Sequence, residues 1–257
     1  MWKSKLAAMM VFAPMSPVSG EVEKEGEQLY ELRTYKAAPG KLDALLARFR
    51  DHTTKLFEKH GMKNVGYWVP VDNKDNLLIY LLAYPNKESR DASWKAFAED
   101  PEWIKAAADS ETDGKLVAKV DSIFLKPTDF FTPFDDLFEP RAGVLFEMRT
   151  YTASASNLPN LLARFRDHTV ALFAKTGIAN MAYFQPNEGQ PGADNTLLYF
   201  LAHKDMDSAT KSWADFRADP DWVAAKKASE EKAGGSLTTE GGVVSVFLEP
   251  TDFSPVK

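Results

Sequence analysis

The spacing of apolar residues predicts an alternation of strands and helices from residue 29 onward. Residues 29–36 form a short run rich in Tyr and Thr, which is typical of a strand. Residues 77–84 are almost wholly apolar, as in a central strand. Between them Leu45, Phe49 and Leu56 recur at helical spacing, and Gly61 is a natural helix end. The predicted elements, in order, are strand 29–36, helix 42–61, strand 64–71, strand 77–84, helix 89–99, helix 101–113 and strand 115–125.

The whole pattern then repeats. The run LLARFRDHT occurs at residues 45–53 and again at 161–169, and YELRTY at 30–35 returns as FEMRTY at 146–151. The ends also match, with SIFLKPTDF in the first copy and SVFLEPTDF in the second. A repeat of this length is the size of a small domain rather than of a solenoid unit. We therefore assign one domain to residues 29–126 and a second to residues 145–253.

The order strand-helix-strand-strand-helix-strand predicts an α+β fold of two tandem ferredoxin-like (βαββαβ) domains. Helices would cover one face of each four-stranded sheet, and the bare face would need a partner. Two copies in one chain supply that partner, so we predict an intramolecular dimeric α/β-barrel. The linker, residues 127–144, is rich in Phe and Pro, and we expect it to pack along the seam between the copies.

Composition narrows the class of function. The chain of 257 residues has 44% hydrophobic and 26% charged residues, which is ordinary for a globular protein. A net charge of −6 argues against nucleic acid as a partner. Because the sequence has no cysteine, disulfides, thiolate nucleophiles and cysteine-ligated metals are excluded. The histidines have no metal-ligand spacing, so we predict no metal site and no cofactor.

The first twenty residues resemble a secretory signal. Lys3 and Lys5 precede the apolar run at residues 6–15, and small residues follow up to Gly20. This pattern predicts a signal peptide at residues 1–20 and a secreted or periplasmic protein. A mitochondrial presequence or a cytoplasmic chain with an irregular start are the alternatives. The apolar run is far shorter than the ~20 residues of a membrane span, and we expect no span elsewhere.

Several motifs together resemble the NIPSNAP family. They are YELRTY, the helix end at His60-Gly61, the strand GYW at residues 66–68, and the string W-x-x-F-x-x-D-P-x-W that begins at Trp94 and returns at Trp213. The resemblance spans both copies and implies the dimeric α/β-barrel fold. The superfamily with this fold includes cofactor-free monooxygenases, lactone isomerases and haem-degrading enzymes, but the family itself implies no assigned reaction.

Two histidines are the candidate catalytic residues. His52 and His168 occupy the same place in the two copies, and helical spacing puts His52 beside the buried stripe. A histidine near a cavity between sheet and helix can act as a general base near neutral pH. The alternative is a structural histidine that bonds a backbone carbonyl or a tyrosine.

A row of polar residues on the first strand of each copy is the candidate ligand-binding set. Glu31, Arg33 and Tyr35 lie two apart and so share one strand face. The second copy has the same row: Glu147, Arg149 and Tyr151. Inside a barrel such a row can bind an anionic or phenolic ligand through arginine. The alternative is a cross-strand ion pair that fixes the pairing between the two copies.

Other polar and aromatic residues have a structural explanation beside the functional one. Four strand tyrosines are further candidates to line a pocket, or else belong to the core: Tyr67, Tyr80, Tyr183 and Tyr199. The arginines of the repeated helix are expected on a solvated face: Arg48, Arg50, Arg164 and Arg166. Two functions therefore remain open. The first is a site for a small aromatic molecule between helices and sheet, with monooxygenase-like or isomerase-like chemistry. The second is a non-catalytic scaffold for partner proteins.

Overall fold

A computed structural model describes residues 28–130 and 144–257 of the chain. The predicted signal peptide and most of the predicted linker lie outside these residues. Repeat 1 consists of β1 (Leu29–Ala37), α1 (Leu42–Arg48), the π-helical turn η1 (Phe49–Thr53), α2 (Thr54–Lys59), β2 (Lys63–Pro70), β3 (Leu77–Tyr84), α3 (Lys87–Glu99), α4 (Pro101–Ser110) and β4 (Val117–Pro127). Every predicted element of repeat 1 is present, with ends that differ by a few residues.

Repeat 2 has the same order of elements. They are β5 (Leu145–Ala153), α6 (Leu158–Arg164), the π-helical turn η2 (Phe165–Thr169), α7 (Val170–Lys175), β6 (Ala179–Pro186), β7 (Thr196–His203), α8 (Met206–Ala218), α9 (Pro220–Ala233) and β8 (Thr238–Pro250). In the described part of the chain no helix is both long and apolar enough to cross a membrane.

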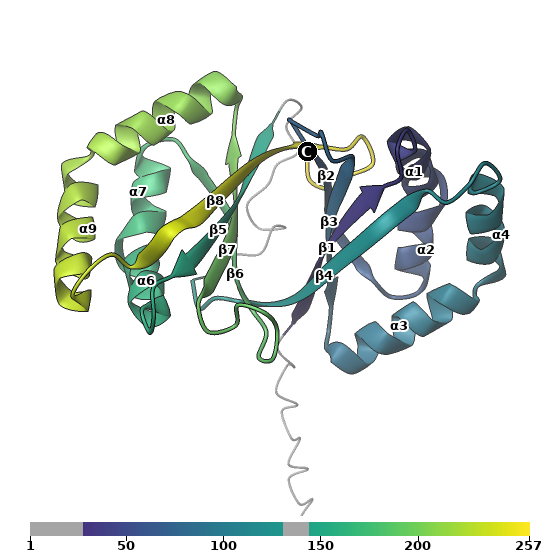
Figure 1. The fold of residues 1–257 in the computed structure, drawn as a ribbon, viewed down its shortest axis with the longest axis horizontal. Helices are drawn as coiled ribbons and strands as arrows, with labels where there is room; N and C mark the ends of the chain where they lie inside the picture. The colour runs from purple at the N-terminus through teal and green to yellow at the C-terminus, as the bar shows by residue number, and fades with distance from the viewer. Residues whose placement is uncertain (1–27, 131–143) are drawn as a thin grey trace, which may run out of the picture.

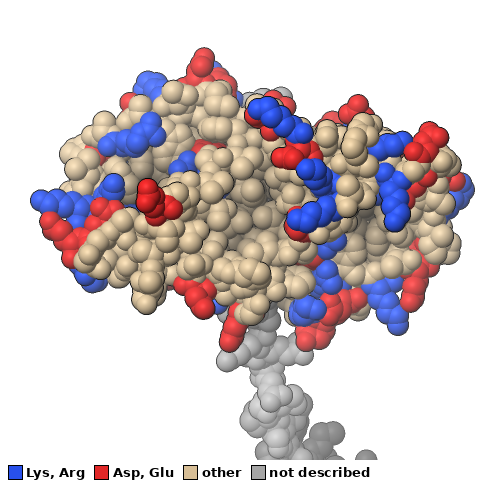
Figure 2. Space-filling view, viewed as in Figure 1, with Lys and Arg blue, Asp and Glu red and all other residues tan. Residues whose placement is uncertain are grey.

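The eight strands close into one barrel, in the order β1-β3-β2-β8-β5-β7-β6-β4. Long antiparallel ladders hold the strands of each repeat together, whereas short ones join the repeats: β2 to β8 through Trp68 and Pro250, and β4 to β6 through Leu125 and Pro186. The predicted intramolecular barrel is thus confirmed. Figure 1 shows the strands at the centre and the helices of the two repeats on opposite outer sides. In the face shown in Figure 2, acidic and basic side chains are interspersed.

The barrel interior is packed with apolar side chains from both repeats. Trp68 stacks on Phe200 at a centroid distance of 5.2 Å, and its ring edge meets Phe146. Tyr30 and Leu32 of β1 point into the same cluster. Two further clusters fill the layer between helices and sheet, one in each repeat. This layer, outside the barrel, is where the polar residues of the strands gather.

The repeated PTDF motif ties each repeat to the other. After β4, the Thr128 N–H donates to the Tyr183 carbonyl at 3.0 Å, and Phe130 packs on the Tyr183 ring. After β8, the Thr251 N–H donates to the Tyr67 carbonyl at 2.9 Å. The aspartates of the motif pair with the repeated helices, Asp252 with Arg50 and Asp129 with Arg166. Arg50 and Arg166 are therefore exposed as predicted, but each holds the tail of the opposite repeat.

The predicted first helix is interrupted in both repeats by a wider turn. The Thr54 N–H donates to the Phe49 carbonyl, five residues back, as in a π-helix. The Thr53 hydroxyl donates to the Arg48 carbonyl at 3.2 Å, and Thr169 repeats this contact with Arg164. The wide turn shifts which of the following residues face inward, and this decides where the histidines lie.

Candidate functional site

The polar row of β1 faces the helices and not the barrel interior. Side chains alternate along a strand, and Tyr30 and Leu32 point into the barrel. Glu31, Arg33 and Tyr35 therefore point outward, under α3 and α4 in repeat 1. The prediction of a row inside the barrel is wrong, because strand alternation fixes which residues share a face but not which face is inner. The alternative of an ion pair between the copies is also wrong, since Arg33 Nη1 bonds Glu31 of its own strand at 2.5 Å.

The Glu31 carboxylate is the centre of a buried charge network. It is fully buried, and it accepts hydrogen bonds from Arg33, from Arg90 at 2.8 and 2.9 Å, and from the Ser122 hydroxyl at 2.7 Å. The Trp94 indole N–H and the Tyr84 hydroxyl also donate to this carboxylate. Burial alone would raise the pKa of Glu31, but the bonds from Arg90 and the charge of Arg33 outweigh it and lower the pKa to about 2.

Repeat 2 builds the same centre with different partners. Glu147 accepts from Arg149 at 2.5 Å, from Ser245 at 2.5 Å and from Trp213 at 2.8 Å, and it contacts His203 Nε2 at 2.9 Å. Burial opposes the charge of Glu147, and the bond to His203 and the charge of Arg149 lower its pKa to about 2. In the alignment of the two repeats, Tyr84 corresponds to His203 and Arg90 corresponds to Ala209. Sequence reasoning missed this use of His203, because no histidine stands at the aligned position of repeat 1.

These two carboxylates predict a loss of stability in acid. The folded pKa of Glu31 and of Glu147 lies near 2, below the ordinary value of 4.5. Each group therefore stabilises the fold fully above pH 4.5, and this stabilisation is lost as the pH falls through 4.5 toward 2. The loss should reach about 3 kcal/mol per group. Urea unfolding between pH 6 and pH 2 measures it, and a flat free energy of unfolding across this range would contradict the assignment.

The predicted ligand-binding tyrosines also lie in this layer. Arg33 Nε donates to the Tyr80 hydroxyl at 2.9 Å, and Arg33 Nη2 reaches Tyr35 at 3.4 Å. Tyr67 stacks on Tyr80 with ring centroids 5.3 Å apart, and its hydroxyl bonds Asn64. Repeat 2 reproduces the arrangement with Arg149, Tyr151, Tyr183 and Tyr199. The structure thus brings the predicted set together in each repeat.

Most of these tyrosines are core residues. Tyr67, Tyr80, Tyr183 and Tyr199 are all buried, and burial raises the pKa of each phenol well above its ordinary value. They stay protonated near neutral pH, and the hydroxyls of Tyr80 and Tyr199 hold Arg33 and Arg149 in place. Tyr35 differs, because it lies partly open at the edge of a cavity.

That cavity lies between the helices and the sheet of repeat 1. It has a volume of about 400 Å³, within the range of small-molecule sites. It is lined by Tyr35, Arg48, Phe49, Thr53, Phe57, Trp94, Phe97, Ala98, Trp103, Ala107, Glu111, Val117 and Val120. The walls are mainly apolar and include six aromatic rings, and the charged groups of the lining are one arginine and one carboxylate.

Arg48 is the polar group of this cavity that stands out. It is 6% exposed, and its guanidinium lies over Trp103 with 5.2 Å between Cζ and the ring centroid. Nη1 donates to Glu111 at 2.9 Å and to Ser110 at 3.3 Å. Its buried Nε has no hydrogen-bond partner among the residues that the structure describes. The prediction of a solvated face is wrong for Arg48 and Arg164, because each is covered by a tryptophan of a later helix, Arg48 by Trp103 and Arg164 by Trp222.

The two candidate histidines lie elsewhere. His52 and His168 are exposed, and the buried stripe of each helix passes through Thr53 or Thr169 instead. The expectation that His52 sits beside the buried face is wrong, because a π-helical turn takes about one residue more than an α-helical turn. Neither histidine lines the repeat 1 cavity. Arg48, Trp103 and Glu111 line it instead, and sequence reasoning assigned none of them to a site.

The fold and the cavity define the class of protein: a two-repeat α/β barrel with a pocket between helices and sheet. Solved structures share this fold. A "putative monooxygenase" from Fusobacterium nucleatum is 10% identical and has a TM-score of 0.56, and the match covers 90% of this chain and 99% of that chain. An "anthrone oxidase-like protein" is 12% identical and has a TM-score of 0.56, and the match covers 88% of this chain and 92% of that chain.

The NIPSNAP family model matches residues 30–132 and 146–255, so this chain belongs to the NIPSNAP family. An uncharacterized NIPSNAP domain protein from Burkholderia xenovorans is 24% identical, with a TM-score of 0.35, over 40% of this chain and 96% of that chain. No protein with a curated description matches the chain.

Proposed function

We propose that the repeat 1 cavity binds a small, flat aromatic molecule with a polar oxygen. The unpartnered Nε of buried Arg48 is the observation that carries the proposal. A buried donor without an acceptor costs about 1–3 kcal/mol, and a ligand oxygen at this point would recover that cost. The aromatic walls formed by Trp94, Trp103 and Phe49 suit a flat ring.

The charges in the cavity favour a neutral ligand with a carbonyl or ether oxygen over an anion. Arg48 is already paired with Glu111 at 2.9 Å, so the site has no excess positive charge of its own. A carboxylate ligand would face Glu111, and a cation would face Arg48. A neutral aromatic ketone avoids repulsion from either Glu111 or Arg48, and its oxygen can still accept a hydrogen bond from Arg48 Nε.

The reaction classes expected from the resemblance need a group that removes a proton from the ligand. Oxygenation without a cofactor and isomerisation next to a carbonyl both begin in this way. His52 lies outside the lining, whereas Glu111 lines the cavity. We therefore propose Glu111 as the proton acceptor if the bound ketone is turned over. The scaffold alternative has less support, because the helix–sheet layer of repeat 1 contains an open cavity.

The test uses the fluorescent ketone Prodan, a flat neutral naphthalene derivative whose emission moves to shorter wavelength in apolar surroundings. Wild-type protein should bind it. Ala107→Phe should fill the cavity and weaken binding about tenfold or more, since overlap in a packed site costs about 1–3 kcal/mol. Ala108 is exposed and absent from the lining, so Ala108→Phe is the matched control and should bind like wild type. Equal binding by both variants would overturn the proposal.

A further inference from the structure

The two repeats differ at the mouth of the cavity. In repeat 1, Ala98 and Ala107 line the cavity beside Trp103. The aligned positions in repeat 2 hold Arg217 and Lys226, beside Trp222. Alanine leaves the mouth of repeat 1 open and uncharged. The same place in repeat 2 carries two cations.

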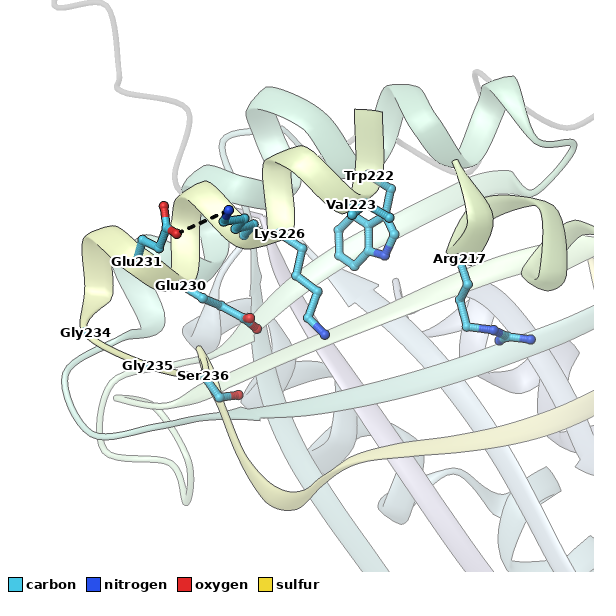
Figure 3. Close-up of a pocket in the computed structure, with 10 residues that line it drawn as sticks. Arg217, Trp222, Val223, Lys226, Glu230, Glu231, Gly234, Gly235 and Ser236 are labelled. Carbon is cyan, nitrogen blue, oxygen red and sulfur yellow. Dashed lines mark ion pairs between the residues drawn. The ribbon is translucent and has the colours of Figure 1, made fainter. Parts of the chain in front are cut away.

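Repeat 2 has its own hollow at this place. It has a volume of about 730 Å³ and is lined by Arg217, Trp222, Val223, Lys226, Lys227, Glu230, Glu231, Gly234, Gly235 and Ser236. Figure 3 shows Arg217 at the end of α8, with Lys226 and Glu230 extending from α9. Three cations and two carboxylates line the hollow, although the chain as a whole has a net charge of −6.

Two of these cations have no carboxylate partner in the part of the chain that the structure describes. Lys227 pairs with Glu231 at 3.8 Å. Arg217 and Lys226 form no ion pair within residues 28–130 and 144–257, and both are exposed. Val223, 53% exposed, gives the hollow an apolar wall next to Trp222. An apolar wall beside unpaired cations suits a ring that carries a negative charge.

A fourth cation lies beneath Trp222. Arg164 is 6% exposed, and its Cζ lies 5.2 Å from the Trp222 ring centroid. Nε and Nη1 have no hydrogen-bond partner among the described residues, and the Glu230 oxygen is 3.8 Å from Nη1. Arg48 in repeat 1, by contrast, has a full hydrogen bond to Glu111. Burial without a close acceptor lowers the pKa of Arg164.

We infer that repeat 2 binds a small aromatic anion at Trp222, with its negative group held by Arg217 and Lys226. The chain then carries two different sites, a neutral one in repeat 1 and a cationic one in repeat 2. This inference rests on the charges of repeat 2 and does not require the ketone site of repeat 1.

The test is calorimetric titration of the full chain with naphthoate, a flat aromatic carboxylate. Wild type should bind one equivalent, and affinity should fall as salt rises, because exposed charges are screened. The double variant Arg217→Ala/Lys226→Ala removes two charged contacts and should weaken binding about tenfold or more. Its Prodan binding should stay at the wild-type level, which separates this test from that of repeat 1.

The reciprocal change gives the matched control. Ala98→Arg/Ala107→Lys places the same cations in repeat 1, and it should add a second naphthoate site while it weakens Prodan binding. The inference is supported if Ala98→Arg/Ala107→Lys gains a second naphthoate site and Arg217→Ala/Lys226→Ala binds naphthoate more weakly. Unchanged naphthoate affinity in Arg217→Ala/Lys226→Ala overturns it, as does a wild type that binds no naphthoate.

Discussion

Replacement of Glu31 by alanine should destabilise the protein by about 3–5 kcal/mol, the usual cost of breaking a buried ion pair from one side. The substitution leaves Arg33 and Arg90 beside each other without the carboxylate that both contact at 2.5–2.9 Å. Glu31 is fully buried, so water cannot replace it as an acceptor without opening the layer. Urea unfolding at neutral pH measures the loss.

Asp91 provides the control for this experiment. It also accepts a hydrogen bond from Arg90, at 3.1 Å, but its side chain is half exposed. Asp91→Ala should therefore change the free energy of unfolding by less than about 1 kcal/mol, as for other surface ion pairs. Similar losses for Glu31→Ala and Asp91→Ala would show that the buried centre has no special role in stability.

A single methyl group at Gly66 should also be costly, by about 3 kcal/mol, because it overpacks a filled core. A Cβ at this position would overlap the Trp68 indole and lie 2.9 Å from a methyl carbon of Val256. Trp68 is fully buried against Phe200 and Phe146, so its ring has no free space to move into. Thermal or urea unfolding of Gly66→Ala measures the effect.

Repeat 2 indicates how to rescue that variant. The positions of Gly66 and Trp68 hold Ala182 and Phe184 there, both fully buried. The smaller ring of phenylalanine leaves room for the methyl group. Gly66→Ala/Trp68→Phe should therefore be more stable than Gly66→Ala alone. If Trp68→Phe lowers the stability of the Gly66→Ala variant further, steric overlap with Trp68 is not the cause of the Gly66→Ala loss.

The sequence predicts the fold well because the signals are local and occur twice. Apolar spacing places each strand and helix, and the duplication supplies the partner that covers the bare sheet face. What spacing cannot show is which face of β1 is inner. Glu31 and Arg33 share a face under either choice, so the polar row was assigned to the barrel when it belongs to the helix layer.

The site is predicted less well, since it depends on one irregular turn and on packing between helices. An ideal α-helix places His52 beside the core, and the π-helical turn at Phe49–Thr53 puts Thr53 there instead. Arg48 is buried because Trp103 and Glu111 cover it. The repeated run LLARFRDHT contains Arg48, so the duplication marked the right segment but not the residue. The place of Trp103 beside a cavity depends on distant chain segments, which a local pattern does not show.

The repeat 1 cavity is proposed to receive a flat aromatic ligand at Arg48. A crystal structure of the full chain soaked with Prodan tests this most directly. We expect the naphthalene ring between Trp94 and Trp103, with the ketone oxygen within hydrogen-bond distance of Arg48 Nε. A cavity without ligand density, or Prodan bound elsewhere on the protein, would contradict it.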